Sequence, residues 1–275
     1  MIDFLTTHGW LLVGLLSAGC AAGFAAGLFG IGGGIVTVPV LYGVFNSLTI
    51  ADDPSLKTAI GTSLAVIIVT SIGSLITHYR AGHVDERMLI GWAPWIALGS
   101  VLGGAAARFA PVEVLAIIFA GGAAYIAYRR IVGKPGNAMA PANLHAKRLK
   151  IPVGLGAGAF SSLMGLGGGA VGVMVMTMAG RQMHQAIATS AGFGVAVAVP
   201  GAASFIVAGW YAPGLPPGSI GYVNVPAFIA VALAAGLMAP IGARLAHRID
   251  GALLSKIFGI YIGIAALALV ADIFN

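Results

Sequence analysis

Two glycine-rich stretches decide how this chain folds: Gly30-Ile31-Gly32-Gly33-Gly34 and Gly165-Leu166-Gly167-Gly168-Gly169. Each stretch lies between two apolar runs of the sequence. Adjacent glycines break a helix and expose backbone N–H and C=O groups, and inside a membrane such groups cannot face lipid. We therefore expect two broken helices whose breaks line a polar cavity within the protein.

The composition indicates that these breaks lie in a membrane. The chain has 275 residues, of which 59% are hydrophobic and 8% charged, whereas a soluble domain carries about 25% charged residues. Apolar runs of about 20 residues recur, long enough to cross a hydrocarbon core of roughly 30 Å as helices. We predict an all-α, polytopic transmembrane helical bundle that has the lipid bilayer as a partner. This composition excludes a secreted disulfide scaffold, a nucleic-acid binder and a disordered chain.

The glycine stretches belong to a longer internal repeat. Lys57-Thr-Ala-Ile-Gly-Thr-Ser63 is followed in the second part of the chain by the similar His184-Gln-Ala-Ile-Ala-Thr-Ser190. We expect an N-terminal repeat over 1–132 and a C-terminal repeat over 151–275, joined by a basic linker at 133–150. Each repeat would hold about five helical segments, with short or broken helices at the glycines. Because five is odd, the two repeats would have inverted topology.

The expected segments follow the apolar runs. They are 10–29, a short piece from the first glycines to 44, 57–78, 89–108 and 112–130, then 151–166, 170–180, 184–208, 222–243 and 253–273. If the linker is cytoplasmic, this topology puts twelve of the 14 Lys and Arg residues on the cytoplasmic side, as the positive-inside rule requires. We therefore expect a multi-pass protein of the cell (inner or plasma) membrane with both termini extracytoplasmic.

The breaks also predict what the protein binds. A half-helix that begins after a break directs its positive dipole end and unpaired N–H groups at the gap, which favours an anion. Broken helices at matching places in two inverted halves are typical of a transport site near the membrane midplane. Close helix packing is the alternative role for such glycines.

The second repeated motif offers charge and hydroxyl groups. Lys57 and His184 each open a span and could contact an anion. The alternative is that Lys57 only anchors the helix end and that His184 is a satisfied interfacial histidine. Thr62, Ser63, Thr189 and Ser190 could donate hydrogen bonds to an oxyanion, or could bond their own helix backbone. All 8 Asp and Glu residues lie in loops or at span ends, which argues against an intramembrane carboxylate as proton or sodium carrier.

Other chemistry lacks the residues that it needs. The six histidines include no H-E-x-x-H motif, and no convincing pair of nucleophile and general base appears. We expect no catalytic residue, no metal site and no cofactor, and therefore no enzyme.

The paired glycine clusters, Pro39 after the first of them, and the two Ala-Ile-x-Thr-Ser segments resemble the TauE/SafE family of sulfite exporters. The resemblance spans nearly the whole chain. It implies a secondary transporter of sulfite, sulfoacetate or related organosulfur anions, with its site between inverted halves. The family's motifs fall on Gly30, Gly32, Gly33, Gly34, Pro39, Gly165, Gly167, Gly168 and Gly169, and on Lys57, Ala59, Gly61, Thr62, Ser63, His184, Ala186, Thr189 and Ser190. The second copy departs from the first at Ala170, Met174 and Ala188, so the cavity would be asymmetric.

We therefore expect a transporter that exports small sulfur-containing anions, including sulfite, sulfoacetate and thiosulfate, by alternating access. Half-helix N-termini and hydroxyls would replace the hydration of the anion, while Lys57 and His184 would supply positive charge from the two repeats. A non-transporting membrane scaffold or accessory subunit and an anion channel remain the alternatives. The sequence leaves open the anion, the direction of transport, the coupling ion and the oligomeric state.

Overall fold

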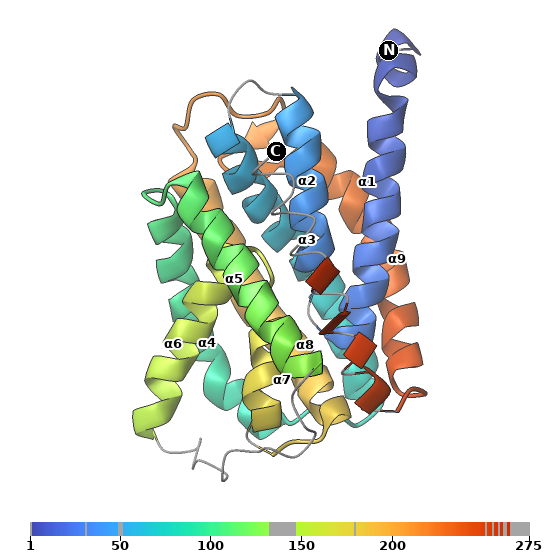
Figure 1. The fold of residues 1–275 in the computed structure, drawn as a ribbon, viewed down its shortest axis with the longest axis vertical. Coiled ribbons are helices and arrows are strands. Elements are labelled where there is room, and N and C mark those ends of the chain that lie inside the picture. Colours follow the sequence, from blue (N-terminus) through green and yellow to red (C-terminus); the bar gives the residue numbers. More distant parts are fainter. Residues whose placement is uncertain are drawn as a thin grey trace.

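The computed structural model describes residues 2–30, 32–48, 52–131, 147–178, 180–250 and short pieces between 252 and 264. Apart from one hairpin of two strands with two residues each, its regular elements are helices (Figure 1). In chain order they are α1 (Ile2–Phe29), α2 (Gly34–Leu48), α3 (Asp52–Arg80), α4 (Glu86–Ala107), α5 (Val112–Ile131), α6 (Lys147–Met164), α7 (Gly169–Met178), α8 (Met183–Ala208), β1 (Ser219–Ile220), β2 (Val223–Asn224) and α9 (Val225–Ala246).

Helix length and polarity confirm a helical membrane bundle. Within the described residues, five helices are long and apolar enough to span a membrane, over Leu12–Phe29, Pro54–Arg80, Glu86–Ala107, Met183–Ala208 and Val225–Ala246. Large apolar side chains such as Ile90 and Leu237 are exposed on the outer surface. Hydroxyls such as Thr70 and Ser190 are buried inside. This distribution is opposite to that of a soluble protein and suits a lipid environment.

The helices follow the expected segments, with shifts at their ends. The largest are at α1, which begins eight residues before the expected span 10–29, and at α3, which begins five residues before the expected span 57–78. The expected span at 222–243 is α9, which begins at Val225 because residues 219–224 form the antiparallel hairpin β1–β2. Helix α6 begins at Lys147, so the last four residues of the expected linker are helical. The rest of that linker and most of the expected span 253–273 lie outside the described residues.

Glycines let two helix pairs approach closely. A Cβ atom at Gly23 of α1 would overlap the backbone of Ala235 in α9, and one at Gly242 would overlap the Phe24 carbonyl. Helices α4 and α6 meet in the same way, since Gly99 lies against the Leu155 carbonyl. Small residues permit such backbone contact between membrane helices. The pairs α1–α9 and α4–α6 therefore form the two flanks of the bundle, with α3 and α8 between them (Figure 1).

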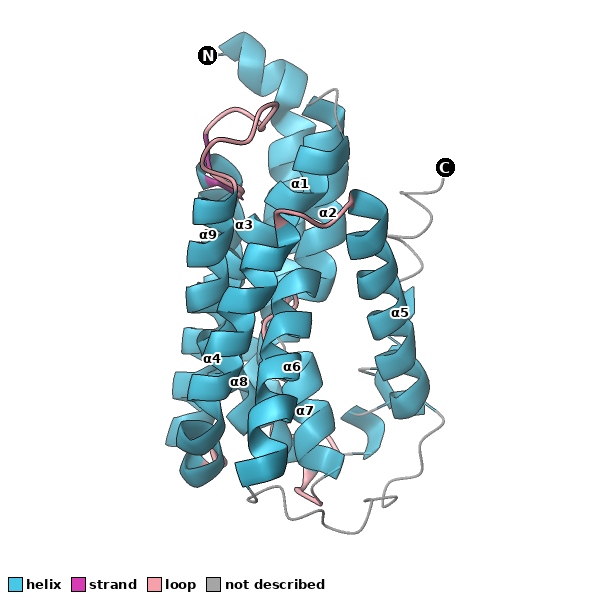
Figure 2. Cartoon of the chain, turned by 90° about the vertical axis from the view of Figure 1, so that its left-hand side faces the viewer, coloured by secondary structure: helices cyan, strands magenta, loops and turns pink. Residues whose placement is uncertain are grey.

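The bundle has two ends that differ in the residues they carry, and the short strands lie at one of them (Figure 2). Helices α3 and α9 end, and α4 and α8 begin, at the end that carries Arg80, Arg87, Arg181 and Arg244, which we call the basic end. At the opposite end α3 and α9 begin and α4 and α8 end, beside the hairpin β1–β2. We call this the hairpin end.

Candidate functional site

The two glycine breaks meet in the interior of the bundle. A Cβ atom at Gly34, the first residue of α2, would overlap the carbonyl oxygen of Gly165. Cβ atoms at Gly32 and at Gly167 would each lie 2.6 Å from Cγ2 of Ile67 in α3. One side chain of α3 thus contacts two breaks that lie 135 residues apart in the sequence.

The backbone at the breaks requires glycine. Gly30, Gly32 and Gly33 have φ angles of 67°, 78° and 84°, and Gly165 and Gly167 have 64° and 56°. These values lie in the left-handed region, where a side chain is strained. Gly34 and Gly168 have ordinary φ angles and are needed for space instead, since a Cβ at Gly168 would lie 2.7 Å from the Phe193 carbonyl oxygen. Gly169 begins α7.

Hydroxyl groups of α3 hold carbonyls of both breaks. The Ser63 hydroxyl donates to the Gly165 carbonyl at 2.9 Å and lies 2.6 Å from the Thr37 hydroxyl of α2. The Thr70 hydroxyl donates to the Gly32 carbonyl at 2.9 Å. With Ile67, these α3 residues have the spacing of one helix face. That face therefore satisfies backbone groups that would otherwise be unpaired in the membrane interior.

The two predicted threonines anchor other helices. The Thr62 hydroxyl accepts from the Asn224 backbone N–H, and the Thr189 hydroxyl accepts from the Asp85 backbone N–H, both at 2.9 Å. Asn224 and Asp85 are the N-caps of α9 and α4. Each threonine thus fixes the N-cap residue of a helix in the other part of the chain.

Ser190 has an unused hydrogen-bonding group. Its side chain is buried, and its hydroxyl has no hydrogen-bond partner among the residues that the structure describes. It lies beside Gly172 in α7, where a Cβ atom would be 3.0 Å from the Ser190 Oγ. A small apolar pocket adjoins this point, lined by Trp92, Ile96, Ala157, Gly168, Gly172, Val175 and Phe193.

The half-helices α2 and α7 both begin at a break, so their N-terminal N–H groups lie in the interior. Pro39 lies half-buried inside α2, where its missing N–H leaves the Ile35 carbonyl without its usual helical partner. Two helix N-termini and a buried hydroxyl are groups that can bind an anion without a full counter-charge.

Lys57 and His184 lie far apart. Lys57 is buried at the hairpin end, with its Nζ 3.5 Å from the carbonyl oxygen of Arg108, which caps the end of α4. The His184 Nε2 lies 3.0 Å from the Ile249 carbonyl oxygen at the basic end. Helix α4, whose 22 residues run from one end to the other, is about 33 Å long. In this conformation the two side chains therefore lie at opposite ends of the bundle, Lys57 at the hairpin end and His184 at the basic end, and do not form one site.

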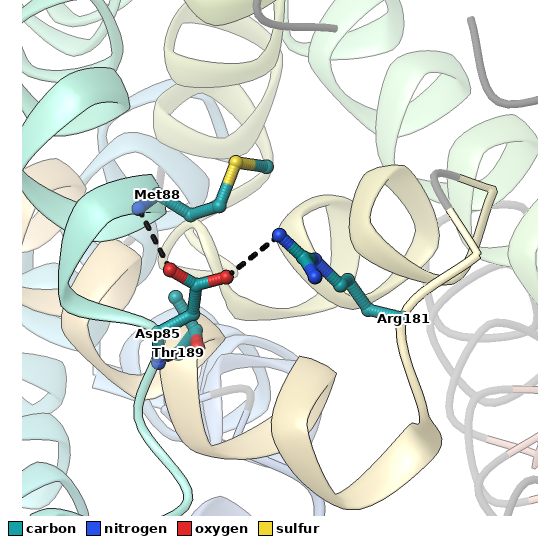
Figure 3. Close-up of polar contacts among 4 residues, drawn as sticks. All are labelled: Asp85, Met88, Arg181 and Thr189. Atoms are coloured by element: carbon teal, nitrogen blue, oxygen red, sulfur yellow. Dashed lines mark hydrogen bonds and ion pairs between the residues drawn. The ribbon is translucent and has the colours of Figure 1, made fainter. Parts of the chain in front are cut away.

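An ion pair lies at the basic end next to Thr189 (Figure 3). Asp85 Oδ2 lies 3.0 Å from a terminal nitrogen of Arg181, in the segment between α7 and α8. The other carboxylate oxygen accepts from the Met88 backbone N–H at 3.0 Å and so caps α4. We call this group of contacts the Asp85 clamp. The corresponding cap at the hairpin end is the uncharged Asn224, whose amide donates to the Pro217 carbonyl.

Reasoning from the sequence missed Thr37, Thr70, Asp85 and Asn224. Thr37 and Thr70 are single hydroxyls in apolar helices, and nothing in their spacing distinguishes them from hydroxyls that bond their own helix. Asp85 and Asn224 did carry a usable signal, because Asp or Asn just before an apolar run is a common helix N-cap.

The chain is similar in sequence to known proteins over most of its length. The family described as "Sulfite exporter TauE/SafE" matches residues 15–269. A probable membrane transporter protein of Haemophilus influenzae is 32% identical over 252 residues, which cover 92% of this chain and 95% of that protein. A probable membrane transporter protein of Methanocaldococcus jannaschii is 27% identical over 270 residues, or 91% of this chain and 93% of that protein. No solved structure matches the chain. The chain is therefore a member of the TauE/SafE sulfite exporter family of membrane transporters.

Proposed function

We propose that this transporter exports small sulfur-containing anions, such as sulfite, sulfoacetate or thiosulfate, by alternating access. The observation that carries the proposal is the meeting of the two glycine breaks on α3, where α2 and α7 both begin. Helix N-termini that converge in the membrane interior favour an anion. The sulfur chemistry of the cargo and the outward direction rest on the description of the family.

Alternating access fits an organisation in two inverted repeats, 1–132 and 151–275. Matching positions in the two parts make matching contacts, which supports this organisation. Gly30 lies against Ile187 as Gly165 lies against Ile60. Thr62 holds the cap of α9 as Thr189 holds the cap of α4. If the two halves rock against each other, the breaks would face one side of the membrane and then the other.

The positive groups would act in turn as the anion passes. Lys57 at the hairpin end and His184 at the basic end would attract the anion at the two mouths, and Ser190 would donate to it at the breaks. By the positive-inside rule, the basic end would face the cytoplasm and both termini would lie outside the cell membrane. Export would then begin at the mouth that the Asp85 clamp closes.

The test is flux in proteoliposomes that contain only this protein. Sulfite, thiosulfate, a small sulfonate and chloride are compared, with and without a proton gradient. We expect saturable flux of at least one sulfur anion, and we expect Ser190→Ala to reduce it about tenfold, because a hydrogen bond to a charged group contributes about 1.5–3 kcal/mol. Ser17→Ala is the matched control, since Ser17 is exposed on α1 and its hydroxyl donates to the Gly14 carbonyl of the same helix.

The alternatives give different results. Flux that rises linearly with concentration and does not saturate would indicate a channel. Correctly inserted protein that moves none of the anions, and that copurifies with a fixed partner, would contradict the proposal and favour a scaffold. Equal flux by Ser190→Ala and Ser17→Ala proteins would remove Ser190 from the site.

A further inference from the structure

Four histidines gather at the basic end, from four parts of the chain. His78 is in the last turn of α3, His83 in the turn that follows, His184 in the first turn of α8, and His247 caps the end of α9. The ring centroids of His78 and His247 are 5.0 Å apart, those of His83 and His247 are 4.7 Å apart and stacked, and those of His83 and His184 are 6.5 Å apart. We call these four residues the histidine cluster.

The cluster connects the protein surface to a glycine break. His83 is exposed, His184 and His247 are half-buried, and His78 is buried. The His78 Nε2 lies 3.3 Å from the Gly27 carbonyl oxygen of α1, three residues before the first break. The His78 Nδ1 lies 3.2 Å from the His247 Nε2. A change of charge in the cluster therefore changes the electrostatic interactions of α1, α3, α8 and α9 at the same time.

The hydrogen bonds define where a proton can bind. The Gly27 carbonyl can only accept, so the proton of a neutral His78 is on Nε2 and its Nδ1 is an acceptor. The His247 Nε2 must then donate to it, which leaves the His247 Nδ1 as an unprotonated acceptor. That atom is buried and has no hydrogen-bond partner within the described part of the chain. The neutral network therefore ends on an acceptor that can take up a proton, the His247 Nδ1.

A proton fits this site better than a metal ion. No set of His, Cys, Asp or Glu side chains among the described residues is arranged to hold a metal. The carboxylates at this end are paired or exposed: Asp85 binds Arg181 and Met88, Asp250 accepts from Ala252 and Leu253, and Glu86 is exposed. The other charged groups described on and beside α3, α4, α8 and α9 at this end are cations, namely Arg80, Arg87, Lys150, Arg181, Arg244 and Arg248. Among the described residues at this end, no unpaired buried carboxylate is therefore available to neutralise positive charge on the cluster.

We propose that the histidine cluster is a proton-binding site and that its protonation opens the basic end of the bundle. A proton on the His247 Nδ1 makes an imidazolium stacked on His83, and a second proton in the cluster adds like charge at short range. Repulsion then separates the ends of α3 and α9 from the start of α8, against the Asp85 clamp. The proposal rests on the proposed transport function, because opening this end is the step that admits cargo from that side.

The direction of the pH effect follows from the environment of His247. Burial, and then the neighbouring His83 and His184, lower the pKa of His247 from its ordinary value of 6.5. When the end opens and the ring is hydrated, the pKa rises back toward that value, so the open form binds protons more readily. The closed form is therefore fully stable above pH 6.5 and loses stability as the pH falls below it. The ratio of open to closed forms changes by up to about tenfold per pH unit for each proton bound on opening.

The test measures the opening without cargo. Cys20 is the chain's one cysteine, and in a Cys20→Ser background spin labels are attached at Ala81→Cys, after α3, and Gln182→Cys, before α8. Both positions are exposed. The distance between the labels is measured in lipid by electron paramagnetic resonance, about one pH unit above and about one below the ordinary histidine pKa. We expect a longer-distance population that grows at the lower pH.

Variants assign the effect to the cluster. His247→Gln keeps an amide donor near the place of Nε2 and removes the titration of this residue, so most of the pH dependence of the distances should be lost. His83→Gln should reduce the shift, and it provides a second variant at an exposed position if His247→Gln does not fold. His8→Gln is the matched control, since His8 belongs to α1 and not to the cluster.

Two results would overturn the proposal. One is that the distances between the labels are distributed equally at both pH values in the background protein. The other is that the change of these distances with pH is the same in His247→Gln and His83→Gln as in the background protein. Flux measured on the same samples separates this proposal from the transport function. A pH-dependent opening without flux of any anion would contradict the transport proposal alone. Flux of a sulfur anion without such opening would contradict the proton site alone.

Discussion

At the scale of single residues, the glycine breaks have no room for a methyl group. Gly34→Ala places a Cβ on the Gly165 carbonyl, and we expect it to lower the free energy of unfolding by about 1–3 kcal/mol, the usual cost of overpacking, and to abolish transport. Gly156→Ala is the control, because nothing lies within 4 Å of its Cβ position. Thermal unfolding in detergent and flux check both variants, and equal melting temperatures would contradict the close approach of the breaks.

The two threonines give a second residue-scale prediction. Thr62→Val and Thr189→Val each remove the acceptor of a backbone N–H, at Asn224 and Asp85 respectively. A donor left unpaired in a buried place costs about 1–3 kcal/mol. We expect similar losses of stability in the two variants, measured by thermal or denaturant unfolding. A neutral Thr62→Val would show that Asn224 is held by the hairpin alone.

The glycine clusters could be predicted from the sequence because adjacent glycines inside an apolar run break a helix where the membrane otherwise demands one. The roles of the hydroxyls could not, because Thr62 and Ser63 are adjacent and only the direction in which each side chain points separates them. Thr62 reaches the cap of α9, whereas Ser63 reaches Gly165. Lys57 and His184 have matching places in the repeat, yet they lie at opposite ends because α3 and α8 run antiparallel.

At the scale of elements, the Asp85 clamp joins the start of α4 to the segment before α8. Asp85→Asn keeps the N-cap and removes the ion pair, as in Asn224 at the other end. We expect it to cost less than about 1 kcal/mol, because Arg181 is 38% exposed and such pairs are weak. Asp85→Ala also removes the cap and should cost about 1 kcal/mol more. Unfolding of the three proteins in parallel checks this order, which would be contradicted if Asn and Ala were equally destabilising.

Most helix boundaries were predictable to within about five residues, because the length of an apolar run is fixed by the thickness of the membrane. The exception is α1, which begins at Ile2, eight residues before the expected span 10–29. Helix partners were not. Gly23 and Gly242 indicate close packing, but any small-residue face can pack on any other, and the sequence does not say that α1 meets α9 or that α4 meets α6. The start of α9 shifted because a hairpin at 219–224 took residues that are apolar enough to continue the span.

At the scale of the whole molecule, the two ends predict an orientation. With Cys20→Ser as background, Phe109→Cys reports on the hairpin end and Gln182→Cys on the basic end, and both sites are exposed. In intact cells we expect a membrane-impermeant thiol reagent to label Phe109→Cys only, because basic ends stay in the cytoplasm. Permeabilised cells, in which both sites should react, are the control. Labelling of Gln182→Cys from outside would reverse the orientation.

The pairing of α1 with α9 has a consequence for how the protein is made. Gly23 packs against Ala235, which is synthesised more than 200 residues later. At about 5–20 residues per second, the ribosome needs roughly 10–40 s to deliver it. During that interval the first helix stands in the bilayer with a glycine-lined groove that any other small-residue helix can occupy. The time during which α1 is without its native partner is therefore inversely proportional to the rate of chain elongation.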